Sequence, residues 1–392
     1  ASPFSRFTRL CAKFMQLHIH PSTLELGSSH WQQYLSLQAD PFSQYAFHAA
    51  LEHSGSVGGD SGWQPLHLEI TEGGKPVALI PSYIKTNSWG EYVFDFEWAN
   101  AYQRYGLEYY PKLISAVPFT PCAGPRVLLV EGADLTTVLG FLQQQLPHLC
   151  SQIKLSSWHW LFAQKPDWEA AQQQSWHQRI GCQYHWYNHD YSQFEDFTAR
   201  LTSRKRKSIK KERRVIVEQG INFTWQQGDN ISQKSLKEFY ACYQSTYLKR
   251  RSQGYLTYQF FSELLTQMPE KLLLVTASKD DSPLAYALFF VDDDTLYGRY
   301  WGCLEEVEFL HFETCYYQGI DYCIAKGIPH FDAGAQGEHK LARGFIPQLT
   351  HSYHYLAETG FNDAIKNFCE AEAQQIEHYM QWAETALPYK AE

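Results

Sequence analysis

Hydrophobic and polar residues alternate along this 392-residue chain with two different periods. Apolar runs closed by glycine or aspartate predict strands, as in the hairpin expected over 65–84 around Gly73 and Gly74. Apolar residues spaced three and four positions apart predict amphipathic helices, as over 135–153 and 310–327. Because both patterns recur along the chain, we expect an α/β protein of the mixed (α+β) kind.

The predicted elements come in a similar order in each half of the chain. In the first half we expect a helix at 43–54, a loop at 55–63, the hairpin, strands at 91–98 and 125–132, a helix at 135–153 and a strand at 156–163. In the second half we expect helices at 194–220, 232–248 and 257–267, three strands within 271–303, a helix at 310–327, strands at 329–335 and 352–357, and a helix at 363–386. The repeated order predicts two packed domains, each a mixed sheet flanked by helices.

The expected domain limits follow from this repeat. Residues 1–40 are interpreted as an irregular N-terminal extension, 41–175 as the first domain and 176–392 as the second, which includes the basic helix 194–220. The segment 176–191 is rich in polar aromatic residues, and we expect it to be the crossover between the domains.

Composition predicts a cytoplasmic protein without a transmembrane segment. No apolar run reaches the roughly 18 residues of a membrane span, and Arg6, Arg9 and Lys13 resemble a transit peptide only weakly. The nine cysteines form no C-x-x-C pair, which argues against a disulfide scaffold and against a Cys-rich zinc site. Histidine pairs such as His18 with His20 lack a third ligand, so no metal site is expected.

The charge of the chain is strongly asymmetric. Nine of the fifteen residues from Arg200 to Arg214 are basic, although the whole chain has a net charge of −9. On one continuous helix, five of these side chains share a face: Arg200, Arg204, Lys207, Lys211 and Arg214. Such charges repel one another unless an anion is bound, so the pattern predicts an anion-binding helix to which Lys205 also contributes. A solvated charged face is the alternative interpretation.

Outside the basic helix the chain is acidic, and this limits the kinds of anion that the helix could bind. A duplex-DNA-binding protein is usually basic throughout, so DNA is disfavoured. The remaining candidates are tRNA, a nucleotide-linked precursor and the phosphates of coenzyme A.

Several long segments resemble one known family. They are "GEYVFDFEWANAYQRYGLEYYPKL" (90–113), "PFTPCAGPR" (118–126), "LTSRKRKSIKKER" (201–213), "LYGRYWGC" (296–303), "LHFETCYYQGIDYCIAKG" (310–327) and "GAQGEHKLARGF" (334–345). Together they resemble the FemAB-like group of N-acyltransferases, described as peptidoglycan biosynthesis or recognition proteins. The resemblance runs from about Pro41 to the last helix. It implies two tandem domains of the acetyltransferase type called GNAT, and an acyl or aminoacyl transfer to an amine.

The acyl donor stays open at this point. GNAT enzymes that use acetyl-CoA carry an R/Q-x-x-G-x-G/A loop that holds the pyrophosphate at a helix N-terminus. This chain has "LEEVEFLHFE" (304–313) at that place, without glycine and with several acids. Fem-type transferases lack the loop and take their acyl group from aminoacyl-tRNA, which a basic helix would suit. No cofactor is therefore certain: the donor is aminoacyl-tRNA or an acyl-CoA, and the acceptor is a small molecule or a precursor.

Acyl transfer to an amine needs a base, donors for the oxyanion and groups that hold an anionic donor. The segment "HFDAGAQGEHKLARGFIP" (330–347) offers each of these. Its candidates are Glu338 and then His339 as the base, Lys340 and Arg343 as anion clamps, and Gly334 and Gly337 as places where backbone donors come close. A charged, exposed turn is the alternative interpretation.

Other candidates are scattered along the chain. Tyr297 and Arg299 alternate on a strand and so share a face, Tyr297 as a catalytic and Arg299 as an anion-binding candidate. The remaining ones are Tyr110, Lys112, Arg126, His311 and Glu313. The leading hypothesis is a cytosolic N-acyl or aminoacyl transferase. The alternatives are an acetyl-CoA-dependent GNAT N-acetyltransferase and a non-catalytic module that binds RNA or a cell-wall precursor.

Overall fold

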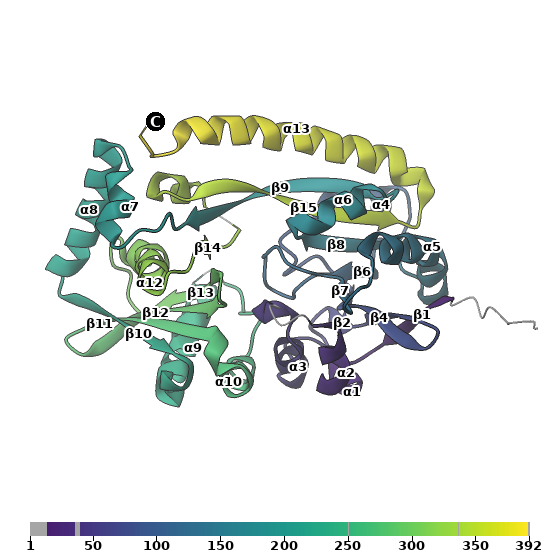
Figure 1. Cartoon of the computed structure of the whole chain (residues 1–392), viewed down its shortest axis with the longest axis horizontal. Helices are drawn as coiled ribbons and strands as arrows, with labels where there is room; N and C mark the ends of the chain where they lie inside the picture. The colour runs from purple at the N-terminus through teal and green to yellow at the C-terminus, as the bar shows by residue number, and fades with distance from the viewer. Residues whose placement is uncertain (1–13, 36–39, 250, 336, 391–392) are drawn as a thin grey trace, which may run out of the picture.

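The computed structural model describes residues 14–35, 40–249, 251–335 and 337–390. Two halves lie side by side along the long axis of the molecule, and helix α13 (Asn362–Ala386) runs along both (Figure 1). Strands and helices are interspersed, and both parallel and antiparallel strand pairs occur. The mixed α/β class expected from the sequence is confirmed.

One sheet of eleven strands passes through both halves in the order β10-β11-β12-β13-β14-β9-β15-β8-β6-β5-β2. Its strands are β2 (Trp63–Pro65), β5 (Tyr83–Lys85), β6 (Lys112–Ser115), β8 (Ser157–Ala163), β9 (His177–Tyr187), β10 (Ile221–Gln227), β11 (Leu272–Lys279), β12 (Ser282–Val291), β13 (Thr295–Cys303), β14 (His330–Asp332) and β15 (Ile346–Leu356). A second sheet in the first half has the order β1-β3-β4-β7. Its strands are β1 (Met15–His20), β3 (His67–Glu72), β4 (Lys75–Ile80) and β7 (Leu128–Leu129).

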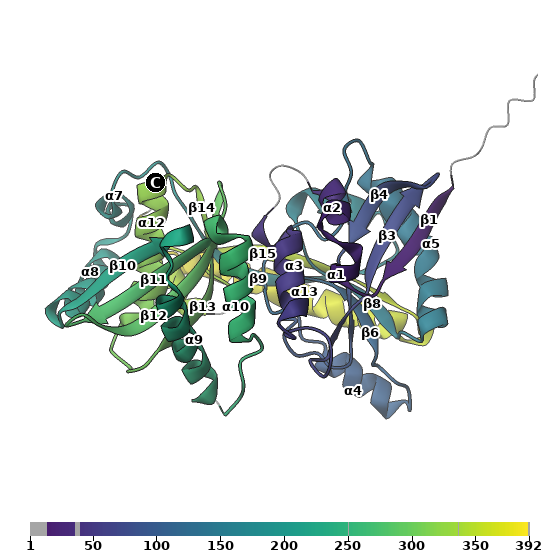
Figure 2. The same cartoon turned by 90° about the horizontal axis from the view of Figure 1, so that it is seen from below.

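Helices cover the faces of these sheets. In the first half they are α1 (Thr23–Leu26), α2 (Ser28–Trp31), α3 (Tyr45–His53), α4 (Phe96–Arg104), α5 (Leu135–Ile153) and α6 (Trp168–Gln172). In the second half they are α7 (Phe194–Ala199), α8 (Ser203–Glu218), α9 (Gln233–Leu248), α10 (Tyr258–Gln267), α11 (Leu310–Phe312), α12 (Gln318–Lys326) and α13. Between α11 and α12 the chain makes a π-helical turn, Glu313–Tyr317. Seen from below, α3 and α10 face each other where the two halves meet (Figure 2).

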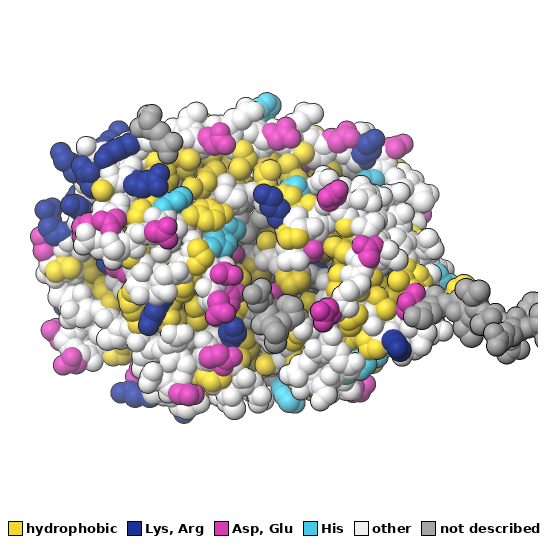
Figure 3. All heavy atoms as spheres, in the orientation of Figure 1, with side chains coloured by type: hydrophobic (Ala, Val, Ile, Leu, Met, Phe, Trp, Pro, Cys, Tyr) yellow, Lys and Arg dark blue, Asp and Glu magenta, His cyan; other side chains and the backbone are white. Residues whose placement is uncertain are grey.

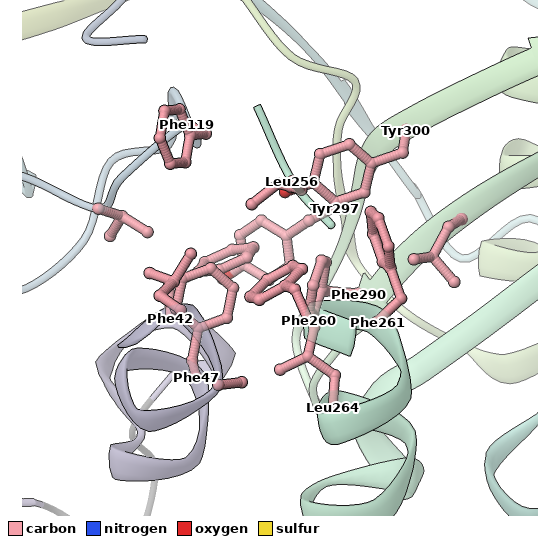
Figure 4. Packing of buried hydrophobic residues seen from close by; sticks show 14 of the residues in the cluster. Phe42, Phe47, Phe119, Leu256, Phe260, Phe261, Leu264, Phe290, Tyr297 and Tyr300 are labelled. Atoms are coloured by element: carbon pink, nitrogen blue, oxygen red, sulfur yellow. The ribbon is translucent and has the colours of Figure 1, made fainter. Parts of the chain in front are cut away.

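An aromatic core joins the two halves. Phe42 and Phe47 of the first half point toward Phe260 of α10 and Phe290 of β12 (Figure 4). The rings of Phe42 and Phe290 are 4.9 Å apart between centroids, and those of Phe42 and Tyr297 are 5.1 Å apart. Aromatic pairs at this separation contribute about 0.5–1.5 kcal/mol beyond their burial. The halves therefore form one packed body around a shared core.

Most helices predicted from the sequence are confirmed, because their amphipathic pattern is local. The helices at 135–153, 232–248, 257–267 and 363–386 are α5, α9, α10 and α13. The hairpin at 65–84 is also confirmed, as β3 and β4.

The strand predicted at 91–98 is wrong. The segment is a loop that leads into α4, because Glu91 and Asp95 turn inward to a buried lysine. Lys112 Nζ lies 2.8 Å from Glu91 Oε2 and 2.5 Å from Asp95 Oδ2. The strand predicted at 125–132 shrinks to Leu128–Leu129.

The segment 176–191, expected to be the crossover between the domains, follows α6 of the first half and precedes α7 of the second. This segment forms β9, which pairs with β15 on one side and with β14 on the other. Two of its four buried side chains, Gln183 and His185, are polar, and Gln183 Nε2 donates to the carbonyl of Pro121 at 2.8 Å. Because these polar side chains have partners far along the chain, the segment lacks the alternation of apolar residues that would predict a strand.

Two further corrections concern the N-terminal extension and the basic segment. Within the predicted extension 1–40, residues 15–20 form β1, which pairs with β3, while Arg6, Arg9 and Lys13 lie outside the described residues. The helix predicted at 194–220 is split into α7 and α8. The break occurs because Thr202 N–H donates to the carbonyl of Pro388 at 2.8 Å. In the part of the chain that the structure describes, no helix is long and apolar enough to cross a bilayer.

Candidate active site where β13 and β14 diverge

The parallel strands β13 and β14 diverge in the second half of the molecule. β14 pairs with β13 only from Thr295 to Tyr297, where Tyr297 lies opposite Asp332. β13 then continues to Cys303, whereas β14 ends at Asp332. The register between β12 and β13 shifts at the same level, so that Arg299 has no residue opposite it in β12. The divergence opens the β13 edge beside the loop that follows β14.

A small cavity lies at this divergence. Its volume is about 100 Å³. It is lined by β12 and β13 residues, by the helix that follows β13 and by Ala333. His311, Cys315 and Tyr316 are the residues that this helix contributes. Burial raises the pKa of the Cys315 thiol well above its usual value, so this thiol is protonated at neutral pH.

A buried ion pair closes one end of the cavity. Arg299 Nη2 lies 2.8 Å from Asp332 Oδ2, and the two side chains are 2 % and 3 % exposed. Asp332 Oδ1 also accepts a 2.8 Å hydrogen bond from the Gly334 N–H. Burial alone would raise the pKa of Asp332, but Arg299 and His185 outweigh it and hold the pKa well below its usual value. The carboxylate is therefore a fixed negative charge at the end of β14.

Two histidines extend this cluster. His185 of β9 lies 3.8 Å from Asp332 through its Nε2, and its Nδ1 is 3.0 Å from His330 Nε2. His330 Nδ1 lies 3.1 Å from the Thr295 hydroxyl. Burial lowers the pKa of both histidines, that of His330 to about 4, so both rings are neutral at pH 7. They link Asp332 to the start of β13.

Lys340 lies beneath the loop that follows β14. Its ammonium group donates to the carbonyls of Ala333 and Gly334, each at 2.8 Å, and the residue is 2 % exposed. Burial lowers the pKa of Lys340 to about 8, although the negative charge of Asp332 opposes this shift. An ammonium has three N–H groups, so two carbonyls leave one donor for a further partner.

His339 is an exposed residue next to Tyr316 and His311, two residues that line the cavity. Its Nε2 lies 2.9 Å from the hydroxyl of Tyr316, and its ring is 6.2 Å from that of His311. Burial, Arg343 and Lys340 lower the pKa of His339, so the ring is neutral at pH 7. The ring folds back over Gly337, where an added Cβ would lie 2.3 Å from His339 Cε1. Gly337 has φ of +113°, a conformation that only glycine adopts easily.

Arg343 connects this loop to the basic helix. Arg343 Nη2 lies 2.9 Å from Glu212 Oε1 of α8, and Arg343 Nη1 donates to the carbonyl of His339 at 2.8 Å. The hydroxyl of Tyr317 also donates to Glu212. The clamp role predicted for Arg343 stays a prediction, and its buried guanidinium holds a carboxylate of the protein itself. Glu212, a buried acid within the basic helix, is its partner.

The outer face of α8 is the exposed cationic surface that the sequence predicted. Arg204, Lys207 and Lys211 are exposed, and Lys205 is half-buried. Dark blue Lys and Arg spheres gather over α8 at the upper left of Figure 3. Arg200 lies outside this helix because of the break before Ser203. The basic face and the loop of His339 and Lys340 therefore belong to one connected part of the molecule.

The structure places the other sequence candidates as follows. Glu338 is exposed at the start of the turn Glu338–Arg343. The Gly334 N–H donates to Asp332 Oδ1 at 2.8 Å, and the backbone-donor role of this glycine stays a prediction. Tyr297 donates to Asp292 at 3.1 Å, and burial raises its pKa well above the usual value. It lines a cavity between the halves rather than the cavity at the divergence.

The remaining candidates have structural partners. Lys112 is buried between Glu91 and Asp95, and Tyr110 shares a 2.7 Å hydrogen bond with Ser88 in the same network. Arg126 is buried and donates to the carbonyl of Cys122. Glu313 lies 2.9 Å from Arg213 of α8. None of these four side chains lines the cavity at the β13–β14 divergence. His311 does line that cavity.

Three residues of the site escaped the sequence analysis: Asp332, His185 and His330. Asp332 carried a usable signal, because an acid at the end of an apolar strand and before glycine is well placed for a site. His185 carried none, since β9 was interpreted as a crossover. Within the described residues, no group of three or more His, Cys, Asp or Glu side chains could hold a metal ion.

Comparisons with known proteins agree with this fold. A family model described as FemAB-like, peptidoglycan biosynthesis/recognition, matches residues 22–391. The chain belongs to the FemAB-like family, and the resemblance stated from the sequence is confirmed. No curated protein matches the chain.

Two solved structures are similar along most of the chain. FemX aligns with 90% of this chain and 100% of its own, at a TM-score of 0.53 and 10% identity. L-PGS from Bacillus licheniformis aligns with 86% of this chain and 98% of its own, at a TM-score of 0.50 and 10% identity. At these identities the similarity is one of fold.

Proposed function

We propose that this protein is an N-acyltransferase that moves an acyl or aminoacyl group from an anionic donor to an amine, at the divergence of β13 and β14. The family, described by peptidoglycan biosynthesis and recognition, supports this class of function. The observation that carries the proposal is the buried lysine Lys340 beside the neutral histidine His339, on a loop bonded to the basic helix through Glu212.

His339 would take the proton from the attacking amine. A neutral imidazole is a suitable base near pH 7. If His339 Nε2–H donates to the hydroxyl of Tyr316, its Nδ1 keeps a lone pair for that proton. Glu338 is the alternative base; both residues are exposed, but it is the His339 ring that is bonded to Tyr316, a residue that lines the cavity.

Lys340 would stabilise the oxyanion that forms on the carbonyl carbon. Two of its N–H groups are fixed by the carbonyls of Ala333 and Gly334, which orients the third. A preorganised donor in a water-poor site is worth about 3–4 kcal/mol in the transition state. Arg299 acts through Asp332, whose bond to the Gly334 N–H holds this loop in place, so we assign Arg299 a positioning role.

The outer face of α8 would hold the anionic donor. Arg204, Lys207 and Lys211 are exposed together, and a polyanion such as tRNA would release counterions on binding them. This proposal extends the donor preference that the family resemblance implied. The acceptor would be an amine-bearing precursor of the peptidoglycan type, in keeping with the family description.

An acetyl-CoA-dependent reaction is the second candidate. It is less favoured because Glu305, Glu306 and Glu308 are exposed just before the helix that follows β13, where they would repel a pyrophosphate. The first turn of that helix also contains Glu313, which Arg213 already neutralises.

A donor comparison tests the proposal. The protein would be incubated with a UDP-linked muramyl pentapeptide and either tRNA charged with labelled amino acids or acetyl-CoA, with amide products identified by mass. We expect an aminoacyl product with charged tRNA, and its loss in Lys340→Met with tRNA binding retained. A product formed from acetyl-CoA alone supports the second candidate. Binding of tRNA without any product overturns the transferase and favours a binding module.

A further inference from the structure

An open groove lies between the basic helix α8 and the outermost strand of the eleven-stranded sheet. Its volume is about 710 Å³. One wall is α8 and the other is β10, and these two elements lie side by side at the left end of the molecule (Figures 1 and 2). Glu313 and Gln318, from the helical segment that follows β13, complete the lining. Because β10 ends the sheet, no other strand of the described residues pairs with its outer edge.

Two aromatic rings lie on the same side of β10. Phe223 and Trp225 both line the groove, and residues two apart in a strand point the same way, about 7 Å from each other. The indole N–H of Trp225 donates to Gln318 Oε1 at 2.9 Å, and the Tyr322 ring makes an edge contact with the indole at 5.3 Å. Trp225 is nevertheless 39 % exposed. The indole is therefore held in one orientation while part of it remains open to a ligand.

Positive charge lines the opposite wall. Lys210, Arg213 and Val217 are spaced i, i+3 and i+7, so they share one side of α8. Arg213 and Val217 line the groove, and Lys210 is exposed beside them. Arg213 Nη2 lies 2.9 Å from Glu313 Oε1 and 2.6 Å from Asp321 Oδ2, whereas its Nη1 has no hydrogen-bond partner among the described residues. Arg213 therefore neutralises these acids and still has N–H groups for a phosphate.

Aromatic rings opposite cations match single-stranded RNA. Unpaired bases stack on aromatic side chains, while Lys and Arg bind the phosphates between them. The bases of a duplex are already stacked on one another, so a duplex would not use the rings. In this respect the groove differs from the outer face of α8, where Arg204, Lys207 and Lys211 offer charge alone.

The groove lies close to the candidate active site. Glu313 and Gln318 line the groove. His311, Cys315 and Tyr316, on the same helical segment, line the cavity at the β13–β14 divergence. A helix with its side chains is about 10–12 Å across. At roughly 3.4 Å per nucleotide, about three or four unpaired nucleotides span that distance.

We propose that the groove between α8 and β10 binds the unpaired 3′ end of tRNA, with one base stacked on Trp225 and the adjoining phosphate at Arg213 and Lys210. This inference rests on the proposed function, in which charged tRNA is the donor. It adds the place where the end that carries the acyl group is held, while the outer face of α8 contacts phosphates of the duplex next to it.

Binding of uncharged tRNA tests the inference, with full-length tRNA and tRNA trimmed of its unpaired 3′ end as the two ligands. Trp225→Ala should weaken binding of full-length tRNA at least about fivefold, the effect of one lost stacking contact, and leave binding of trimmed tRNA unchanged. Trp225→Phe, which keeps an aromatic ring, should stay within about twofold of the wild type. The slope of log K against log salt should not change in Trp225→Ala, because stacking releases no counterions.

Two further variants complete the test. Trp382→Ala removes a tryptophan that is 52 % exposed on α13, and as the matched control it should bind both RNAs like the wild type. Val217→Glu keeps the test decisive if Trp225→Ala is poorly folded, because position 217 is 71 % exposed. The added negative charge at the groove should weaken binding of full-length tRNA at least about threefold. Leu248→Glu, at a position 66 % exposed at the end of α9, is its control and should leave binding unchanged.

The inference is overturned if Trp225→Ala loses as much affinity for trimmed as for full-length tRNA, or none for either, or if Val217→Glu binds like the wild type. Absence of any tRNA binding also overturns it, and leaves acyl transfer from another donor in place. Binding of the 3′ end through Trp225 without product in the donor assay supports the groove and contradicts the transferase. The two failures are distinguishable because this measurement uses uncharged tRNA and no acceptor.

Discussion

Glu212 of the basic helix and Arg343 of the β14 loop form a buried ion pair, with 2.9 Å between Oε1 and Nη2. This contact joins the surface proposed to hold the donor to the loop that carries His339 and Lys340. Glu212→Gln would leave the Arg343 charge buried with a weaker partner, which destabilises a protein by about 3 kcal/mol. Urea unfolding measures the change. Glu218→Gln on the same helix, where the carboxylate is exposed and 3.5 Å from Arg214, should change stability by less than about 0.5 kcal/mol. Equal effects of the two variants would show that the buried pair has no special role.

The cationic face of α8 predicts a salt-dependent interaction with a polyanion. Replacing Arg204, Lys207 and Lys211 with Gln should weaken tRNA binding and reduce the slope of log K against log salt by about 2–3, roughly 0.7–0.9 for each lost contact. The fold should persist because these side chains are exposed. Lys75, Lys234 and Lys237, exposed elsewhere, provide a control triple variant of the same charge change. An identical slope in both triple variants would mean that α8 is merely a solvated charged surface.

The depressed pKa of Lys340 predicts how stability depends on pH. Its pKa falls from 10.5 to about 8 in the folded state, so between these values the unfolded chain binds more protons than the folded one. Stability contributed by this group therefore rises with pH in that window and is constant below it. Relative to Lys340→Met, the wild type should gain about 2 kcal/mol between pH 7.5 and pH 9.5, at roughly 1.36 kcal/mol per unit above pH 8. Urea unfolding of both proteins across this range checks it, and parallel curves would refute it.

Gly337 and Gly334 offer a matched test of how the His339 ring is positioned. Both have positive φ, +113° and +85°, so alanine is strained at either place. Only at Gly337 would the new Cβ meet the His339 ring, at 2.3 Å, whereas at Gly334 its nearest neighbour is the Gly298 carbonyl at 3.6 Å. We expect both variants to lose about 1–3 kcal/mol of stability. Gly337→Ala should in addition lower turnover roughly tenfold or more below Gly334→Ala, because small displacements of a reacting group are costly. Equal turnover of Gly337→Ala and Gly334→Ala would show that the position of the His339 ring does not affect catalysis.

The sequence predicted those parts of the fold that depend on neighbouring residues. Helices α5 and α9 have apolar positions at helical spacing, so their limits could be predicted closely. Strand β9 could not, because the hydrogen bonds of its buried Gln183 and His185 go to partners far along the chain.

In the candidate site, too, the sequence predicted what depends on neighbouring residues and missed what depends on distant partners. The glycines and charges of 334–343 marked the loop that holds Lys340 and His339. The bond between Arg299 and Asp332 joins two strands, and that between Glu212 and Arg343 joins a helix to a distant loop. Pairings at this separation leave no local pattern, which is why Arg343 was interpreted as a free clamp.

The most direct test of the account is the turnover of His339→Gln beside that of its neighbour Glu338→Gln, in the donor assay with charged tRNA. Glutamine at 339 can still contact the hydroxyl of Tyr316 but cannot accept the proton. The account predicts that His339→Gln lowers kcat by about a hundredfold with tRNA affinity unchanged, the usual size of a general-base contribution. Glu338→Gln should stay within about threefold of the wild type, since it is the His339 ring that is bonded to the cavity-lining residue Tyr316. Normal turnover of His339→Gln would contradict the assignment of the base, and a large loss in Glu338→Gln alone would transfer that role to Glu338.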